Sequence, residues 1–155
     1  MDIEIEGFDK LMSQLNHLES NLSYALGMAA LAAAKTLEAE TKITVTKNKP
    51  SGERYMRGYS GKRKKKIKYH IASAPGEPPA VDTGHLRNSI SSQLVTTSSK
   101  FAEAEMAVGA EYGLALEKGT SRMQPRPFVA PSVMSAMEKM VRVARSKFKE
   151  YMGNL

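Results

Sequence analysis

Six positively charged side chains fall within seven positions, between Lys62 and Lys68. The surrounding stretch reads GYSGKRKKKIKYHI, with Tyr59 and Tyr69 on either side of the cluster. Dense lysine and arginine runs bind polyanions through contacts with their negative groups. The chemistry that this segment offers is therefore electrostatic binding, and the alternative is a solvated loop that only aids solubility.

The positive charge of the chain is concentrated in this one region. Positions 47–70 hold ten Lys and Arg against one acid, Glu53, a net charge of +9, whereas the whole chain of 155 residues carries +7. The remainder therefore carries −2, so the sequence predicts a nearly neutral domain with one basic appendage at about residues 47–72. The residues expected to face DNA or to dock a partner are Arg54, Arg57, Lys62, Arg63, Lys64, Lys65, Lys66 and Lys68.

Catalytic and metal-binding patterns are weak by comparison. The three histidines lack HExxH spacing, and no phosphate-binding or nucleophile-elbow motif occurs. The triplet from Asp82 to Gly84 matches an aspartic-protease motif, but that chemistry needs two aspartates that share a proton and an apolar strand leading into them. Here Pro78-Pro79-Ala80 leads in, so we interpret Asp82 as a helix cap or connector contact. We expect no enzyme activity, no cofactor and no metal.

The composition sets the class of protein. Hydrophobic residues make up 41% and charged residues 25% of a chain long enough for a single domain over residues 1–155. The absence of cysteine excludes a disulfide scaffold and fits folding in a reducing cytosol. The acidic, alternating N-terminus is unlike a signal peptide, and the longest apolar run has ten residues, so we expect no membrane contact.

Periodicity predicts the elements that must position the basic segment. Residues 1–6 alternate as in a short strand, and an apolar stripe from Phe8 to about Thr41 predicts a long helix. Its small residues, 27–34, allow close approach of another backbone, such as a neighbouring subunit. Residues 43–46 favour extended structure, and residues 55–59 and 67–71 predict the two arms of a hairpin. The proline-rich stretch 72–79 predicts a stiff connector.

The second half of the chain alternates short helices and strands. Residues 84–89 predict a short helix capped by Asp82 or Thr83, followed by strands at 90–97 and 102–110. Residues 112–118 predict a helix stopped by Gly119, and residues 124–128 are expected to be extended. A last helix from Pro131 to Gly153 has an apolar stripe at Met134, Met137, Val141, Ala144, Phe148 and Tyr151. The predicted fold is α+β, a small antiparallel sheet packed by the long N-terminal helix and the C-terminal helix, with a protruding basic hairpin.

The order of motifs from residue 72 to 150 resembles the tail-completion, or head–tail joining, family of long-tailed bacteriophages. Members show a PG-x-PP connector, then TG-x-L-R-x-S-I, then Y-(small)-x-x-x-E-x-GT, and RPF before a closing helix. The matching residues are Pro75, Gly76, Pro78, Pro79, Thr83, Gly84, Leu86, Arg87, Ser89, Ile90, Tyr112, Glu117, Gly119, Thr120, Arg126, Pro127 and Phe128.

The resemblance implies a virion protein with a tail-terminator-like fold that forms a ring, expected to be a hexamer, in the phage neck. Implied partners are other copies of the chain, a connector or stopper ring on the head side, terminator or tail-tube proteins on the tail side, and double-stranded genomic DNA in the lumen. Assembly would take place in the host cytoplasm. Loops vary in length where the basic insert lies, so the role of the insert rests on its charge.

Individual roles follow from the matched motifs. Leu86 and Ile90 are expected in the core, and Arg87 is free to reach a carboxylate. Glu117 is expected to pair with Arg126 or with Arg87 of a neighbouring subunit, and Phe128 to anchor the last helix. The alternative function is a stand-alone nucleic-acid-binding module that uses the basic hairpin, although 6% aromatic residues and no tryptophan offer few groups to stack on bases.

Overall fold

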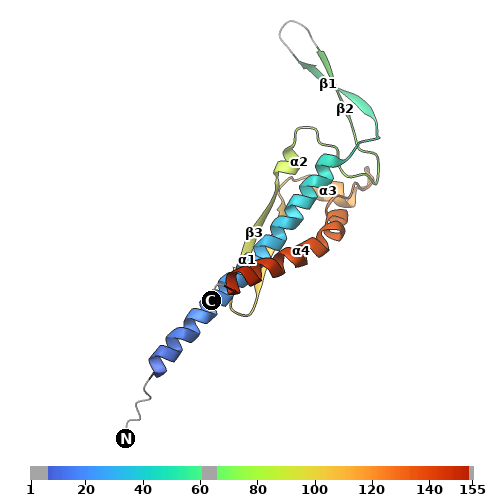
Figure 1. Ribbon diagram of the computed structural model, residues 1–155. Coiled ribbons are helices and arrows are strands. Elements are labelled where there is room, and N and C mark those ends of the chain that lie inside the picture. Colours follow the sequence, from blue (N-terminus) through green and yellow to red (C-terminus); the bar gives the residue numbers. More distant parts are fainter. Residues whose placement is uncertain (1–6, 61–65, 154–155) are drawn as a thin grey trace.

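The computed structural model describes residues 7–60 and 66–153, with side chains except at 57–60 and 66–68. It is an elongated α+β structure in which one helix, α1 (Phe8–Lys47), runs along most of the length (Figure 1). The strand predicted for residues 1–6 lies outside the described residues. At 1.5 Å per residue, the 40 residues of α1 span about 60 Å.

The remaining elements form two separate two-stranded antiparallel sheets and three further helices in the described chain. The first sheet pairs β1 (Arg54–Ser60) with β2 (Lys66–Ile71), and the second pairs β3 (Ile90–Thr97) with β4 (Ala102–Val108). The helices are α2 (His85–Asn88), α3 (Gly113–Lys118) and α4 (Val129–Met152). The predicted α+β class, both hairpins, the irregular connector and all four helices are confirmed.

Helix α1 extends beyond the predicted end near Thr41, and the extended structure predicted for residues 43–46 is wrong. β-Branched residues disfavour a helix by only a few tenths of a kcal/mol each. Val45 is 1% exposed, and burying a valine side chain contributes about 1.5–3 kcal/mol. Thr44 and Thr46 donate hydrogen bonds to backbone carbonyl oxygens four residues earlier, at 3.0 and 2.7 Å. Tertiary packing therefore outweighs local propensity.

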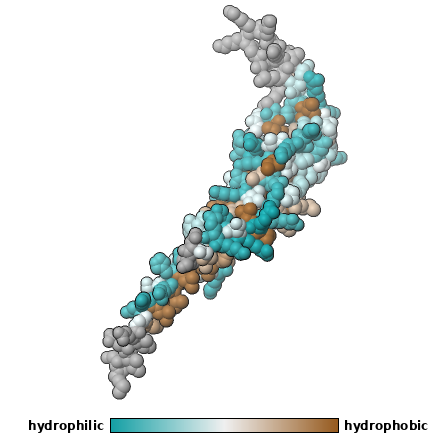
Figure 2. Space-filling model, viewed as in Figure 1, coloured by the Kyte–Doolittle hydropathy of each residue, from teal (hydrophilic) through white to brown (hydrophobic). Residues whose placement is uncertain are grey.

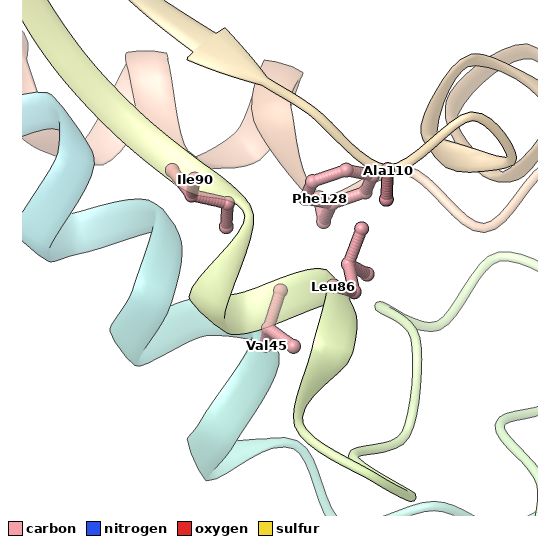
Figure 3. Packing of buried hydrophobic residues seen from close by; sticks show 5 residues of the cluster. All are labelled: Val45, Leu86, Ile90, Ala110 and Phe128. Carbon is pink, nitrogen blue, oxygen red and sulfur yellow. The ribbon is translucent and has the colours of Figure 1, made fainter.

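The apolar core is small and lies where the C-terminal half of α1 meets the chain's other elements. It consists of Val45, Leu86, Ile90, Ala110 and Phe128, which point toward one another (Figure 3). Phe128 and Ile90 are each 1% exposed. These residues come from α1, α2, β3, the segment after β4 and the start of α4, so one cluster joins nearly every element of the body.

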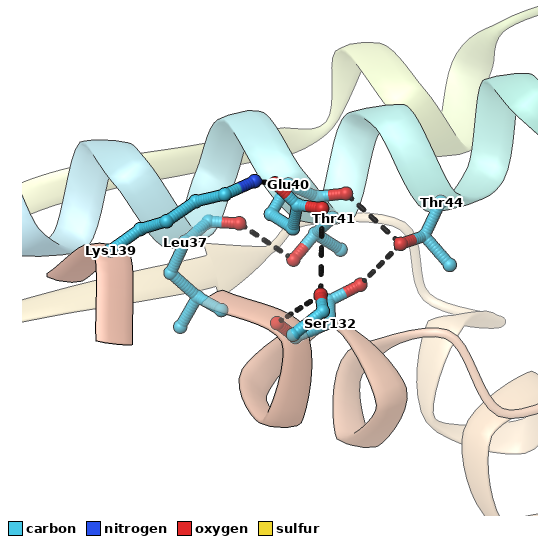
Figure 4. Close-up of polar contacts among 7 residues, drawn as sticks. Leu37, Glu40, Thr41, Thr44, Ser132 and Lys139 are labelled. Carbon is cyan, nitrogen blue, oxygen red and sulfur yellow. Dashed lines mark hydrogen bonds and ion pairs between the residues drawn. The ribbon is translucent and has the colours of Figure 1, made fainter. Parts of the chain in front are cut away.

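Helix α1 packs against α4 and against both strands of the β3–β4 sheet. The contact with α4 includes a polar seam (Figure 4). The hydroxyl of Ser132, which is fully buried, lies 2.8 Å from Thr44 Oγ1, and Lys139 Nζ pairs with Glu40 Oε2 at 3.0 Å. Small and polar side chains at this seam allow the two helix backbones to approach closely.

The buried face of α4 differs from the predicted stripe. Ser132 and Ala136 are buried, whereas Met134, Met137 and Val141 are 81%, 57% and 47% exposed. Residues 144, 148 and 151, later in the stripe, are half-buried. The prediction for the first two turns is wrong because the helix turns its small residues, rather than its large apolar ones, toward α1.

The small-residue segment of α1 is used within the chain. A Cβ atom added at Gly27 would lie 3.1 Å from Thr97 Oγ1 and 3.4 Å from a methyl carbon of Leu94, both on β3. The Thr97 hydroxyl donates to the carbonyl of Ser23 at 2.7 Å. The close approach predicted for residues 27–34 is therefore found between α1 and β3. No helix in the described ranges is long and apolar enough to cross a bilayer.

Replacing Gly27 by leucine should destabilise the fold by about 1–3 kcal/mol, because the larger side chain must displace β3 from α1. Denaturant unfolding followed by circular dichroism measures the change. The matched control, Ser20→Leu, places the same side chain on an exposed turn of α1 and should change stability by less than about 0.5 kcal/mol. Equal stability of the two variants would contradict the tight contact at Gly27.

Candidate functional site

The basic hairpin, residues 54–71, projects from the end of the body where α1 ends (Figure 1). Its strands pair from Arg54 opposite Ile71 to Ser60 opposite Lys66, with an irregularity in register between Met56 and Gly58. A two-stranded hairpin is marginally stable alone in water, so its base must be fixed by other contacts. The candidate site is therefore the projecting hairpin together with the structure that holds it.

The strands carry four of the predicted basic residues. Arg54 and Arg57 belong to β1, and Lys66 and Lys68 belong to β2. Lys62, Arg63, Lys64 and Lys65 follow β1 in sequence and lie outside the described residues.

Aromatic contacts brace the lower part of the hairpin. The guanidinium carbon of Arg54 lies 3.9 Å from the centroid of the Tyr69 ring, a cation–π arrangement. The rings of Tyr55 and His70, which are opposite each other in the register, meet edge to face at 5.4 Å. His70 Nδ1 lies 3.5 Å from a carboxylate oxygen of Asp82. Tyr69 therefore already has a cation on its ring, which favours bracing over base stacking.

Backbone pairing continues the hairpin into the body. The Gly52 N–H donates to the carbonyl of Ala72 at 2.9 Å, and the Ala72 N–H donates to the carbonyl of Glu53 at 2.9 Å. A Cβ atom at Gly52 would lie 2.7 Å from the Ala72 oxygen, which is closer than real Cβ contacts, so this position requires glycine. The two chains entering and leaving the hairpin are thus held side by side.

The Glu77 carboxylate ties the connector to the loop that follows α1. It accepts hydrogen bonds from the hydroxyl and the N–H of Ser51 and from the N–H of Ala74, the last at 2.9 Å. These donors, the Ser51 hydroxyl foremost, lower the pKa of Glu77 from its ordinary value. Nearby, the side chain of Asn48 donates to the carbonyl of Pro78.

The two groups of motif residues, 75–90 and 112–128, meet directly beneath the hairpin. The Gly76 N–H donates to the Pro125 carbonyl at 2.9 Å, and Arg126 Nη1 donates to Ser73 Oγ at 3.0 Å. The Arg126 N–H also donates to the Leu116 carbonyl at 2.7 Å. Segments separated by about 50 residues in sequence therefore form one base for the hairpin.

Glu117 does not pair with Arg126, one of the two partners predicted for it; pairing with Arg87 of a neighbouring subunit stays a prediction. Its carboxylate accepts hydrogen bonds from the backbone N–H groups of Phe128, Val129 and Ala130, at 2.8, 2.9 and 2.9 Å. These are the first N–H groups of α4, which have no partner inside the helix, and a negative charge there also complements the helix dipole. The expected pairing of Glu117 with Arg126 is wrong, since Arg126 bonds Ser73 instead.

The other motif residues fall into three kinds of position. Leu86, Ile90 and Phe128 are buried, and Ser89 Oγ donates to the Leu86 carbonyl at 2.8 Å. Gly84, with a φ of 81°, occupies the N-cap of α2 in place of Asp82 or Thr83, although Thr83 Oγ1 accepts from the His85 N–H at 3.2 Å. Gly119 ends α3, and the exposed or half-buried residues are Pro75, Gly76, Pro78, Arg87, Tyr112, Thr120 and Pro127.

A cavity of about 210 Å³ lies at the hairpin base, between the hairpin, the connector, α2 and α3. Its lining includes His70, Pro79, Asp82, Arg87 and Arg126. Among the described residues that line it, Asp82 alone carries a carboxylate, so one chain does not assemble the paired aspartates of an aspartic protease here. Within the described ranges, no three His, Asp or Glu side chains are placed to hold a metal ion.

Comparison of the chain with protein-family models, curated protein sequences and solved structures found no match.

Replacing Glu117 by alanine should destabilise the protein by about 2 kcal/mol, because three N–H groups at the start of α4 lose a charged acceptor. Urea unfolding measures the loss. Glu111→Ala, an exposed glutamate just before α3, is the matched control and should change stability by less than about 0.5 kcal/mol. A loss no larger than that of the control would contradict the capping role.

Acidification should loosen the hairpin base at Glu77. Because the pKa of Glu77 is lowered in the folded state, its carboxylate stabilises the fold at neutral pH, and this contribution is lost as the pH falls through a value below 4.5. Amide chemical shifts of Ser51 and Ala74 followed by NMR should titrate together with that midpoint. Glu77→Gln should abolish the shared titration, and a midpoint above 4.5 in the wild type would contradict the assignment.

Proposed function

We propose that this chain is a structural subunit of a bacteriophage neck, one of a ring of copies, expected to be six, that completes the tail and joins it to the DNA-filled head. The observation that carries the proposal is the basic hairpin on a rigid base built from the motif residues. The resemblance of those motifs to the tail-completion family supports the neck as the setting, in the virion after assembly in the host cytoplasm.

The placement of the base supports a mechanical role for the motif residues. Gly76, Glu117 and Arg126 are engaged in hydrogen bonds that join the connector, α3 and the start of α4. Such contacts fix the direction in which the hairpin leaves the body. A binding element whose direction is fixed can be presented to the same place by every subunit of a ring.

Double-stranded DNA in the ring lumen is the proposed contact of the hairpin. Six hairpins would supply about 36 positive charges from residues 62–68 alone, and lysine-rich contacts with phosphates hold DNA without reading its sequence. Lysine suits a passing genome because its charge is mobile and forms no fixed bidentate contact. Docking on an acidic face of a connector or tail protein is the competing role for the same residues.

A stand-alone nucleic-acid-binding module would use the hairpin differently. It would stay a monomer or dimer and would need groups that stack on bases or read their edges. The Tyr69 ring is covered on one side by Arg54, and Tyr55 contacts His70, so the described aromatic residues of the hairpin are engaged within the protein. This favours backbone-directed contact with duplex DNA.

Replacing Lys64, Lys65 and Lys66 by glutamine should weaken binding to duplex DNA and reduce the slope of log K against log salt by up to about 2.7, because each phosphate that a lysine neutralises adds about 0.9 to the slope. Fluorescence anisotropy over a range of salt concentrations measures both quantities. The matched control replaces three lysines away from the hairpin, Lys35, Lys100 and Lys149. It removes the same charge and should leave the slope unchanged.

An equal reduction of the slope in the two triple variants would mean that DNA binding follows net charge and does not involve the hairpin. Particle size, measured after neck proteins are added to the same samples, separates the two functions, because a ring component should form hexamers with its neck partners, whereas the stand-alone module should bind DNA as a monomer or dimer.

A further inference from the structure

The guanidinium of Arg126 lacks a hydrogen-bond acceptor at the wall of the 210 Å³ cavity beneath the hairpin, which we call the base cavity. Its Nε atom is the one buried side-chain nitrogen or oxygen without a partner in the described part of the chain. The side chain is held in place all the same, because Nη1 donates to Ser73 and the backbone N–H donates to Leu116. Buried donors in native proteins are almost always bonded, so this atom needs an explanation.

Positive charge exceeds negative charge in the lining of the base cavity. Two arginines, Arg87 and Arg126, line it together with one carboxylate, Asp82, and with His70. Asp82 lies 3.5 Å from His70 Nδ1. Within the described ranges Arg87 forms no ion pair and its side chain makes no hydrogen bond, and no acid forms an ion pair with Arg126. The lining therefore carries a net positive charge even when His70 is neutral.

Glu77 lies near Arg126 without neutralising it. The Glu77 carboxylate accepts hydrogen bonds from Ser51 and Ala74, and these donors lower its pKa more than the charge of Arg126 does. No ion pair joins Glu77 to Arg126 among the described residues. A negative group that enters the base cavity would therefore be the first carboxylate to pair with this guanidinium.

The remaining walls of the base cavity are largely apolar. Val45, Leu86 and Leu116 line it, and the first two belong to the core (Figure 3). The rings of Tyr55 and Tyr112 also line it and are 47% and 45% exposed, so a molecule can enter from solvent between partly exposed residues. A cavity of about 150 Å³ holds one benzene molecule, so this cavity has room for a body of that size and a carboxylate.

We propose that the base cavity binds a carboxylate attached to a small apolar body about the size of benzoate. Arg87 and Arg126 bind the carboxylate, because the planar guanidinium matches its two oxygens and forms strong charged hydrogen bonds with them. The apolar walls cover the body. A single negative charge is favoured over a phosphate dianion, because Asp82 in the same lining repels each added charge.

Two sources share this chemistry. One is a free small carboxylic acid, and the other is an aspartate or glutamate side chain that a neighbouring protein inserts beside an apolar residue. The site requires neither the proposed ring nor DNA. Because its walls come from the hairpin, the connector, α2 and α3, a bound molecule would contact both the hairpin and the structure that holds it.

Titration of the full chain with sodium benzoate, followed by NMR, tests the site. The Arg126 Nε–H resonance should shift and saturate, and benzoate should bind at least about tenfold more tightly than benzyl alcohol, which has the ring without the charge. Inorganic phosphate, which lacks the apolar body, should also bind at least about tenfold more weakly than benzoate. Equal affinity for either control compound would overturn the proposal.

A pair of arginine variants tests whether the charge acts locally. Arg87→Gln removes an exposed side chain without a printed structural bond, so the circular dichroism spectrum should stay the same, and benzoate affinity should fall by about tenfold. Arg122→Gln, the matched control, removes the same charge from an exposed position outside the lining and should leave the affinity unchanged. Equal losses in the two variants would overturn the proposal.

A peptide separates the two sources. The affinity for acetyl-Phe-Glu-amide is compared with that for benzoate, and acetyl-Phe-Gln-amide is the uncharged control. Tighter binding of the glutamate peptide supports a side chain of another protein, and tighter binding of benzoate supports a free small molecule. Failure of both carboxylates to give a saturable shift at Arg126 would overturn the proposal.

The lysines of the hairpin are intact in Arg87→Gln and Arg122→Gln, so this inference and the proposed function can fail separately. Loss of benzoate binding in Arg87→Gln with an unchanged salt dependence of DNA binding supports a separate carboxylate site. Benzoate binding by a protein that does not bind DNA would keep the base cavity as a site and remove only the DNA-facing role of the hairpin.

Discussion

The length of α1 is the constraint on which the rest of the structure depends. A 40-residue helix spans about 60 Å, and the remaining chain covers only part of it. Its buried residues begin at Ala25 and end at Val45, so the body packs on the C-terminal half. The first turns of α1, residues 8–18, are left bare at one end (Figure 2), and the chain leaves the other end directly into the loop that leads to the basic hairpin. The exposed apolar turns and the basic hairpin therefore lie at opposite ends of one long helix.

The elements that pack on α1 are held together by local contacts around a small apolar core. Phe128 lies in the core at the point where α4 begins. The Glu117 carboxylate accepts hydrogen bonds from the first three backbone N–H groups there, those of residues 128–130. The same segment bonds the connector through Arg126 and Ser73. The start of α4, helix α2 and the base of the hairpin thus belong to one connected structure. Motifs far apart in sequence therefore meet in one structure at the base of the hairpin.

Elements with strong boundary residues could be predicted from the sequence, whereas the side-chain partners could not. Gly119, Gly153 and the prolines of the connector mark boundaries through backbone geometry, which is local. The extended structure predicted for residues 43–46 is wrong because the burial of Val45, a tertiary effect, outweighs β-branched propensity. The α4 stripe misleads because exposed Met137 and Val141 have the same spacing as core residues.

The partner of Glu117 shows the same limit for a polar residue. Opposite charges suggest that a glutamate pairs with an arginine, yet unpaired N–H groups at a helix start attract a carboxylate equally well. A glutamate 14 residues before the predicted helix start at Pro131 is too weak a signal to reveal this capping contact, because the turn that brings the two together is set by the tertiary fold.

Helix α1 separates the exposed apolar first turns at one end from the basic hairpin, the proposed polyanion-binding element, at the other. We propose that the hairpins converge on the axis of a ring built from such subunits. A cryo-EM map of the neck of an intact phage particle that contains this protein tests that claim most directly. We expect a closed ring of copies with residues 54–71 of each directed at the DNA in the lumen. A single copy in the neck, hairpins directed outward to solvent, or a neck without this chain would contradict it.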